Sequence, residues 1–252
     1  MTAEAAPDRA VLRLSGADCH HFLTGLVTHD AAPGALVYSA ILSPQGKYLA
    51  DFFLLDRGRD ILLDVKTDLA DGLLQRLTMY RLRADVQIEK TGLAVARGLG
   101  RGPEGSLPDP RHPGLGWRAY DVAGKTGHTD WDALRVAHLI PESGIELIPG
   151  ESYILEMGFD RLAGVDHRKG CYVGQEVTAR MKHKTELRKG LAQVEIDGSA
   201  PVGTPILASG KPTGTLFTQS GGRALAYLRF DRARGEMRAA DAIINWPAAE
   251  NS

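Results

Sequence analysis

The chain of 252 residues has few cysteines, few aromatic residues and almost no net charge. Its two cysteines, Cys19 and Cys171, are far apart in sequence and do not suggest the disulfide framework of a small secreted protein, so reduced thiols in the cytosol are the simpler interpretation. Because 30 basic residues nearly balance 31 acidic ones, no overall field attracts the chain to nucleic acid or to a membrane. Recognition of a partner must therefore depend on local patches.

Long apolar runs are also missing, and none approaches the length needed to cross a bilayer. The N-terminal residues MTAEAAPDRA carry two acids and no apolar segment, unlike a secretory signal or an arginine-rich transit peptide. We therefore expect a cytoplasmic protein with no membrane partner. The length allows one or two domains.

The segment 167–176, HRKGCYVGQE, places Cys171 between two glycines and next to basic side chains. The glycines allow the backbone to turn sharply and to approach a ligand closely. The histidine, arginine and lysine before the cysteine would favour its thiolate form. A reactive site and a tight turn with a half-exposed cysteine are both compatible with these residues.

The first 90 residues show alternating and helical apolar patterns that are typical of a ferredoxin-like α+β unit. The turn Ser43-Pro44-Gln45-Gly46 predicts a hairpin, and Thr67 or Asp68 is expected to cap the second helix. The expected strands are 11–14, 37–42, 48–55, 61–65 and 86–88, and the expected helices lie near 19–27 and 67–81. The residues Cys19, His20 and His21 are expected on the surface of the first helix, where consecutive side chains cannot share one metal ion.

The second half of the chain changes character twice. Residues 98–116 are rich in glycine and proline and are expected to form a long surface loop. Thr129 and Asp132 have the spacing of a capping box for a helix that must end before Pro141. Beyond the basic run near residue 186, short apolar segments between turn signals predict a small β-barrel or sandwich, so we expect domains 1–186 and 187–252.

The motif after Arg168 resembles the signature of the YgfZ type of folate-binding protein. That signature is a Lys-Gly-Cys-Tyr-x-Gly-Gln-Glu octapeptide, and Arg180 also stands at its usual place after it. The blocks SGADCHHFLTGLVTHD, SPQGKYLADFFLL and LLQRLTMYRLRADVQI resemble the family as well, so the resemblance covers nearly the whole chain. The seven fixed positions are matched here by Lys169, Gly170, Cys171, Tyr172, Gly174, Gln175 and Glu176.

This resemblance, which extends to glycine-cleavage aminomethyltransferases, implies an α+β fold with ferredoxin-like subdomains in a ring and a small C-terminal β-barrel. It implies a tetrahydrofolate ligand and iron–sulfur client or assembly proteins as partners. Cys171 would contact iron or sulfur of a client cluster, and Lys169 would stabilise the anion. The folate-binding residues would be Gly170, Tyr172, Gly174, Gln175, Glu176 and Arg180.

Two departures from the aminomethyltransferase pattern concern folate and chemistry. Ala137 stands where those enzymes carry the glutamate that holds the pterin ring, so another acceptor is needed, with Glu142, Glu146, Glu176 or backbone carbonyls as candidates. Only Asp51 remains of an aspartate pair, and either a general base or a hydrogen-bonded turn residue fits its position near a strand end. We expect weak folate binding.

The function predicted first is that of a folate-dependent accessory factor in iron–sulfur cluster assembly or repair. The alternative is a tetrahydrofolate-dependent aminomethyl or methyl transferase or demethylase that uses Asp51, so whether the chain is an enzyme stays open. Between residues 166 and 190, seven lysines and arginines and three acids give a local net charge of plus four. Since aromatics are scarce there, nucleic acid is not expected as the ligand. A transient metal or cluster site of Cys171 with His167 and His183 also stays open.

Overall fold

The computed structural model describes residues 3–183 and 186–247. The chain forms two compact units, each built from two stretches of sequence. The first unit contains Met1–Thr129 and Phe159–Ala179, and the second contains Asp130–Gly158 and Arg180–Ser252. The predicted boundary near residue 186 takes no account of this interleaving and stays a prediction.

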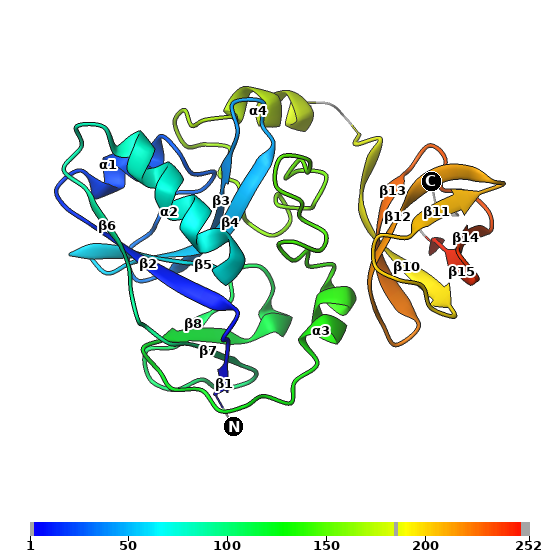
Figure 1. The fold of residues 1–252 in the computed structure, drawn as a ribbon, viewed down its shortest axis with the longest axis horizontal. Coiled ribbons are helices and arrows are strands. Elements are labelled where there is room, and N and C mark those ends of the chain that lie inside the picture. Colours follow the sequence, from blue (N-terminus) through cyan, green and yellow to red (C-terminus); the bar gives the residue numbers. More distant parts are fainter. Residues whose placement is uncertain (1–2, 184–185, 248–252) are drawn as a thin grey trace. The chain divides into compact units, whose positions relative to one another are not determined.

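A five-stranded sheet with strand order β3-β4-β5-β2-β6 organises the first unit (Figure 1). Its strands are β2 (Arg9–Ser15), β3 (Leu36–Leu42), β4 (Tyr48–Asp56), β5 (Asp60–Lys66) and β6 (Gln87–Lys90). All five predicted strands are therefore confirmed. The order β6-β2-β5-β4 and the antiparallel pairing of its neighbours are those of a ferredoxin-like sheet, to which β3 is added as a further antiparallel strand beside β4.

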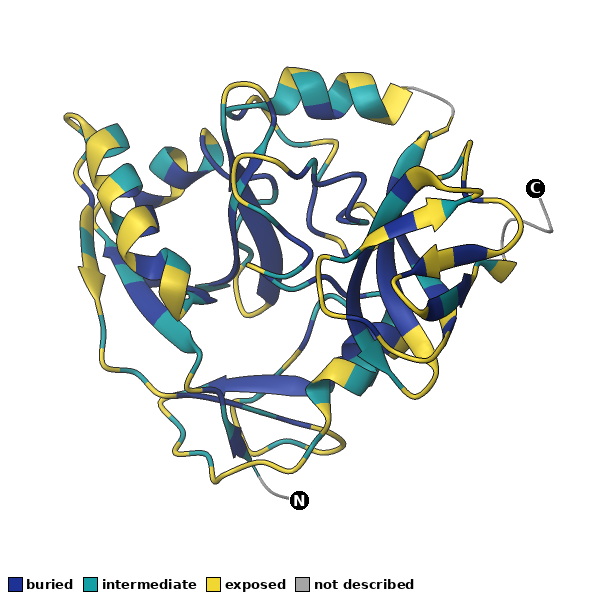
Figure 2. Ribbon diagram, turned by 45° about the vertical axis from the view of Figure 1, so that its right-hand side comes forward, coloured by how far each residue is buried: buried dark blue, intermediate teal, exposed yellow. Residues whose placement is uncertain are grey.

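Helices α1 (Cys19–Thr24) and α2 (Thr67–Arg81) cover one face of this sheet. Cys19 and Leu23 of α1 pack in the same apolar cluster as Leu73 and Leu77 of α2. Figure 2 shows the sheet strands as largely buried and the outer side of α2 as exposed. The expected surface position of Cys19 is wrong, because the first residue of α1 faces this core and is 5% exposed.

The N-caps predicted for two helices are also corrected. Lys66 occupies the N-cap of α2 and makes no capping hydrogen bond, so neither Thr67 nor Asp68 caps it. Helix α3 (Trp131–His138) is capped by Asp130, whose carboxylate accepts a 2.8 Å hydrogen bond from the backbone N–H of Ala133.

A small four-stranded sheet, ordered β1-β7-β9-β8, completes the first unit. Buried ion pairs join it to the large sheet, since Arg118 of β9 contacts Asp64 of β5 at 3.2 Å and Asp109 at the same distance. The expected long loop includes the short strand β8 and a 3₁₀ turn, Pro113–Leu115. The strands are β1 (Glu4–Ala5), β7 (Val95–Gly98), β8 (Leu107–Pro108) and β9 (Trp117–Tyr120).

A closed six-stranded barrel, with order β10-β13-β12-β11-β14-β15, dominates the second unit. Helix α3 is fixed to it through Arg135, which contacts buried Glu146 at 3.0 Å and donates to Thr218 at 2.8 Å. The expected α+β fold with a C-terminal barrel is therefore confirmed. The barrel strands are β10 (Lys189–Asp197), β11 (Pro205–Ala208), β12 (Lys211–Ser220), β13 (Arg223–Arg229), β14 (Met237–Ala239) and β15 (Ala242–Asn245). Among the described residues, no helix is long and apolar enough to span a bilayer.

Candidate functional site

Cys171 lies in the loop that precedes helix α4 (Gln175–His183), and it is exposed. The structure therefore places Cys171 outside the packed core. Cys19 differs, because burial raises the pKa of its thiol. Of the two sulfurs, that of Cys171 is the accessible one.

Lys169 anchors the loop that carries Cys171 through the hydrogen bonds of its ammonium group. Its ammonium donates to the backbone carbonyls of Thr24 and Val27 at 2.9 and 2.6 Å, and to the carboxylate of Asp30 at 2.7 Å. The side chain is 2% exposed, and burial lowers its pKa against the opposing effect of Asp30. All three ammonium protons are thus directed to the end of α1 and the loop after it, and the role of stabilising an anion at Cys171 stays a prediction.

Val173 attaches the other side of Cys171 to the same loop after α1, and Tyr172 packs beside Lys169. The ring of Tyr172 is buried, and the ammonium of Lys169 lies 5.2 Å from its centroid. Burial raises the pKa of the Tyr172 hydroxyl, partly offset by a hydrogen bond with Thr178. The backbone N–H of Val173 donates to the carbonyl of Gly25 at 3.2 Å. Cys171 therefore projects from a backbone that is held on both sides.

Gly174 locks the loop against the β3–β4 hairpin. Its φ is +84°, and a Cβ there would lie 2.6 Å from the carbonyl oxygen of Ser43 and 3.1 Å from the Cα of Gly46. Gly46 faces it with φ +73°, and a Cβ at that position would lie 2.7 Å from Val177. Gly170 differs, because its surroundings are open and its φ is not positive. Of the two glycines in the motif, only Gly174 is required as a glycine by the backbone.

Helix α4 carries the remaining motif residues. The side-chain amide of Gln175 reaches back to the carbonyl of Gly170 at 3.4 Å. Glu176 and Arg180 are exposed, one in the first turn and one toward the end, which suits the helix dipole. The predicted roles of these residues toward folate stay predictions.

Asp51 lies within β4 rather than at a strand end, and its side chain is buried. Its carboxylate accepts hydrogen bonds from the hydroxyls of Tyr38 at 2.9 Å and Tyr48 at 2.7 Å. Burial, followed by the charge of Asp51, raises the pKa of Tyr38 well above its ordinary value. Both carboxylate oxygens thus have tyrosine donors in a closed environment, and the role of general base stays a prediction.

Several groups were considered as hydrogen-bond acceptors for the pterin ring in place of the glutamate that Ala137 replaces. These groups differ in how accessible they are. The carbonyls of Val136 and Ala137 both accept from the side-chain amide of Gln193, at 2.5 and 3.3 Å. Glu146 is fully buried and accepts from Arg135, from the backbone of residue 142 and from residue 218. Glu176 is exposed on α4. Of these groups, Glu176 offers its carboxylate to solvent.

The proposed metal or cluster group of Cys171, His167 and His183 is not supported by geometry. Within 3–183 and 186–247, no three His, Cys, Asp or Glu side chains are placed to hold one ion. His167 instead pairs with Asp160 at 2.7 Å. In the basic run, Lys184 lies outside the described residues.

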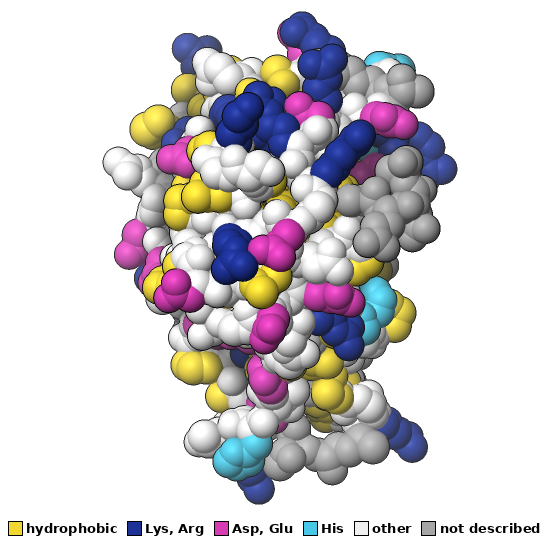
Figure 3. All heavy atoms as spheres, turned by 90° about the vertical axis from the view of Figure 1, so that its right-hand side faces the viewer, with side chains coloured by type: hydrophobic (Ala, Val, Ile, Leu, Met, Phe, Trp, Pro, Cys, Tyr) yellow, Lys and Arg dark blue, Asp and Glu magenta, His cyan; other side chains and the backbone are white. Residues whose placement is uncertain are grey.

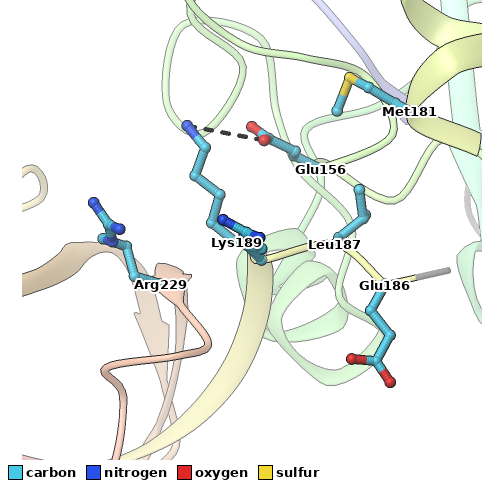
Figure 4. Close-up of a pocket in the computed structure, with 7 residues that line it drawn as sticks. Glu156, Met181, Glu186, Leu187, Lys189 and Arg229 are labelled. Atoms are coloured by element: carbon cyan, nitrogen blue, oxygen red, sulfur yellow. Dashed lines mark ion pairs between the residues drawn. The ribbon is translucent and has the colours of Figure 1, made fainter. Parts of the chain in front are cut away.

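A separate cavity of about 870 Å³ lies in the second unit (Figure 4). Lys189 and Glu156 point toward one another there at 3.8 Å, while Glu186 points away. Glu156 also accepts a 2.6 Å hydrogen bond from Tyr227, and burial together with this carboxylate raises the pKa of that hydroxyl. Met181, Leu187 and Arg229 also line the cavity. Sequence reasoning missed this group because Glu156 and Arg229 lie far in the chain from the segment 186–189.

Comparisons with known proteins identify the relatives of this chain. Residues 188–248 match the family model of the CAF17 C-terminal beta-barrel domain. The chain is 30% identical to the mitochondrial iron-sulfur cluster assembly factor IBA57 of Homo sapiens, over 91% of this chain and 78% of that protein, and 29% identical to the Mus musculus protein over the same shares. A homologue from Phaeosphaeria nodorum is 28% identical, over 89% of this chain and 69% of that protein.

The fold has a counterpart among solved structures. The glycine cleavage system aminomethyltransferase T from Bartonella henselae superposes with a TM-score of 0.76 at 12% identity, covering 96% of this chain and 83% of that chain. The likeness confirms the aminomethyltransferase-like fold.

The predicted cytoplasmic location is contradicted by these comparisons, because the relatives are named as mitochondrial proteins. Composition, charge and cysteine count do not specify a compartment, so they could not separate the two locations. With 30% identity across most of both chains, this protein belongs to the IBA57 family of iron–sulfur cluster assembly factors.

Proposed function

We propose that this protein acts in the assembly or repair of iron–sulfur clusters through the exposed thiol of Cys171. The observation that carries the proposal is the accessible cysteine on a backbone fixed at Lys169 and Gly174. Membership of the IBA57 family supports the same process. The octapeptide around Cys171 further supports a YgfZ type of protein within this family.

The chemistry follows from the number of available ligands. Iron in clusters prefers thiolate ligands and needs several of them. Cys171 supplies one accessible sulfur, and the described residues contain no group of three His, Cys, Asp or Glu side chains that could hold an ion. Cluster iron would therefore keep its other ligands on a client or assembly protein, and these proteins are the partners we propose.

Tetrahydrofolate is proposed as a weakly bound ligand, with an affinity in the micromolar range or above. The residues fit it in part: Glu176 offers an exposed carboxylate for the pterin edge, and Arg180 offers a cation for the glutamate tail. The bound folate would supply a reduced pterin that accepts one-carbon units. Because Asp51 is enclosed by two tyrosines, the geometry favours the accessory role over the alternative of a one-carbon transferase or demethylase.

Complementation tests the thiol. In cells lacking the native protein, Cys171→Ala is expected to fail to restore the activity of iron–sulfur enzymes, whereas Cys19→Ala, tested at matched protein abundance, should restore it. Normal enzyme activities with Cys171→Ala would refute the role given to this sulfur.

Calorimetric titration with tetrahydrofolate tests the ligand independently. We expect saturable but weak binding, reduced about tenfold in Glu176→Gln because one charge-assisted hydrogen bond is lost. Glu104→Gln, a change at an exposed acid outside the motif, is the control and should bind like the wild type. Equal binding by both variants would remove Glu176 from the pterin site.

A further inference from the structure

The barrel carries a second hollow, of about 450 Å³, beside the turn between β11 and β12. Its lining comes from this turn and from the loop between β13 and β14. The lining residues are Ala208, Ser209, Lys211, Arg232 and Arg234, and we call the space the barrel hollow.

The β13–β14 loop is built so that two arginines stand outward. Ala233 is fully buried in the barrel core. The backbone N–H groups of Arg232 and Ala233 both donate to the carbonyl of Arg229 at 2.9 Å, which closes a tight turn. Because Ala233 is held inside, Arg232 and Arg234 on either side of it are exposed.

The cations of the barrel hollow are poorly neutralised. Across the described part of the chain, Lys211 and Arg234 have no ion-pair partner, and Arg232 has only Asp231 at 3.9 Å, with both side chains 51% exposed. Residues 229–238 contain four arginines and two acids, so with Lys211 the local charge is plus three in a chain whose net charge is minus one. Basic side chains gather in the upper part of the face drawn in Figure 3.

We propose that the barrel hollow binds a multivalent phosphate anion such as a pyrophosphate or triphosphate group. Guanidinium groups match phosphate oxygens with paired donors, and lysine adds a mobile charge. The hydroxyl of Ser209 at the hollow supplies a further donor. Its size is that of a small-ligand pocket.

The residue types that line the barrel hollow also indicate which part of a ligand would be recognised. None of the described lining residues is aromatic, so a nucleic-acid base would find no aromatic ring to stack on there. The phosphate chain itself is then the recognised group, whether it is free or part of a nucleotide. This site is separate from the thiol of Cys171 and does not depend on the function proposed for it.

Calorimetry on the full chain at low salt tests the proposal with sodium tripolyphosphate, pyrophosphate and inorganic phosphate. We expect saturable binding of tripolyphosphate and pyrophosphate with one site, at least tenfold weaker binding of inorganic phosphate, and a steep loss of affinity with added salt. Arg234→Gln and Lys211→Gln should each weaken binding about five- to tenfold. Arg223→Gln, a change at an exposed arginine of β13 outside the hollow, is the matched control and should bind like the wild type.

Two further ligands distinguish the sources of phosphate. ATP binding as tightly as tripolyphosphate would support recognition of the phosphate chain. A single-stranded RNA that binds more tightly, and is lost in the same variants, would support the site with a nucleic-acid backbone as its source. Absence of saturable binding of tripolyphosphate, or unchanged binding in Arg234→Gln and Lys211→Gln, would overturn the proposal.

Discussion

Lys169→Met should lower the free energy of unfolding by roughly 2–3 kcal/mol. The replaced side chain is 2% exposed, and methionine keeps the apolar stem while removing the ammonium. The carbonyls of Thr24 and Val27 then lose this donor, at a cost of roughly 1 kcal/mol each. The carboxylate of Asp30 also loses the ammonium as a donor. Because the Asp30 side chain is 38% exposed, water can partly replace the ammonium, and the loss of this contact costs less.

Urea unfolding followed by circular dichroism measures this difference, with an unchanged dependence on urea showing that the unfolded state is the same. Arg168→Met is the matched control, because the neighbouring Arg168 side chain is 96% exposed, and it should unfold like the wild type. Equal stability of Lys169→Met and wild type would refute the anchoring of the loop by this residue. An equal loss in Arg168→Met would show that the effect is not specific to the buried ammonium.

Three further changes test the local structure. Gly174→Ala should destabilise by about 3 kcal/mol or more, because the new Cβ would collide with backbone, whereas Gly170→Ala should unfold like the wild type; similar midpoints in urea would contradict this contrast. Leu82→Gly should raise the melting temperature, with a gain of about 1 kcal/mol, because Leu82 is 87% exposed and has φ 47° and ψ −107°, and a lower melting temperature would count against strain at this position. Burial by itself would raise the pKa of Asp109, but Arg111 lowers it to about 2. This carboxylate therefore contributes stability above pH 3.8 that is lost as the pH falls toward 2, on the order of 2 kcal/mol. Asp109→Asn should flatten the acid side of the stability curve measured by urea unfolding, and an unchanged slope would contradict the ion pairing.

Local patterns in the sequence were sufficient for much of the fold. The alternation of apolar residues located each strand of the large sheet, and the Ser43-Pro44-Gln45-Gly46 turn located its hairpin. The cap of α3 was displaced by one residue, because Asp130 and Thr129 are both suitable cap residues and only the tertiary contacts decide. Thr129 is instead a donor to Glu4 of β1.

The site was harder to predict, because its contacts join distant residues. Lys169 and Asp30 are separated by 139 positions, so no local pattern indicated that the ammonium of Lys169 would be paired with Asp30. Gly170 and Gly174 are alike in sequence, yet only Gly174 packs against the hairpin. Asp51 was placed near a strand end, and of its two tyrosine donors Tyr48 lies three residues earlier in β4, whereas Tyr38 is brought close only by the pairing of β3 with β4. The exposure of Cys171 was predictable because small and charged neighbours rarely form a core.

Selective alkylation tests the central role of the Cys171 thiol most directly. Brief treatment of the folded protein with iodoacetamide should modify Cys171 and spare buried Cys19, as read by mass spectrometry of the peptides. The modified protein would then be added to an extract from cells that lack it, and the recovery of an iron–sulfur enzyme would be measured. We predict that untreated protein restores the activity and the singly alkylated protein does not; full restoration by protein blocked at Cys171 would contradict the account.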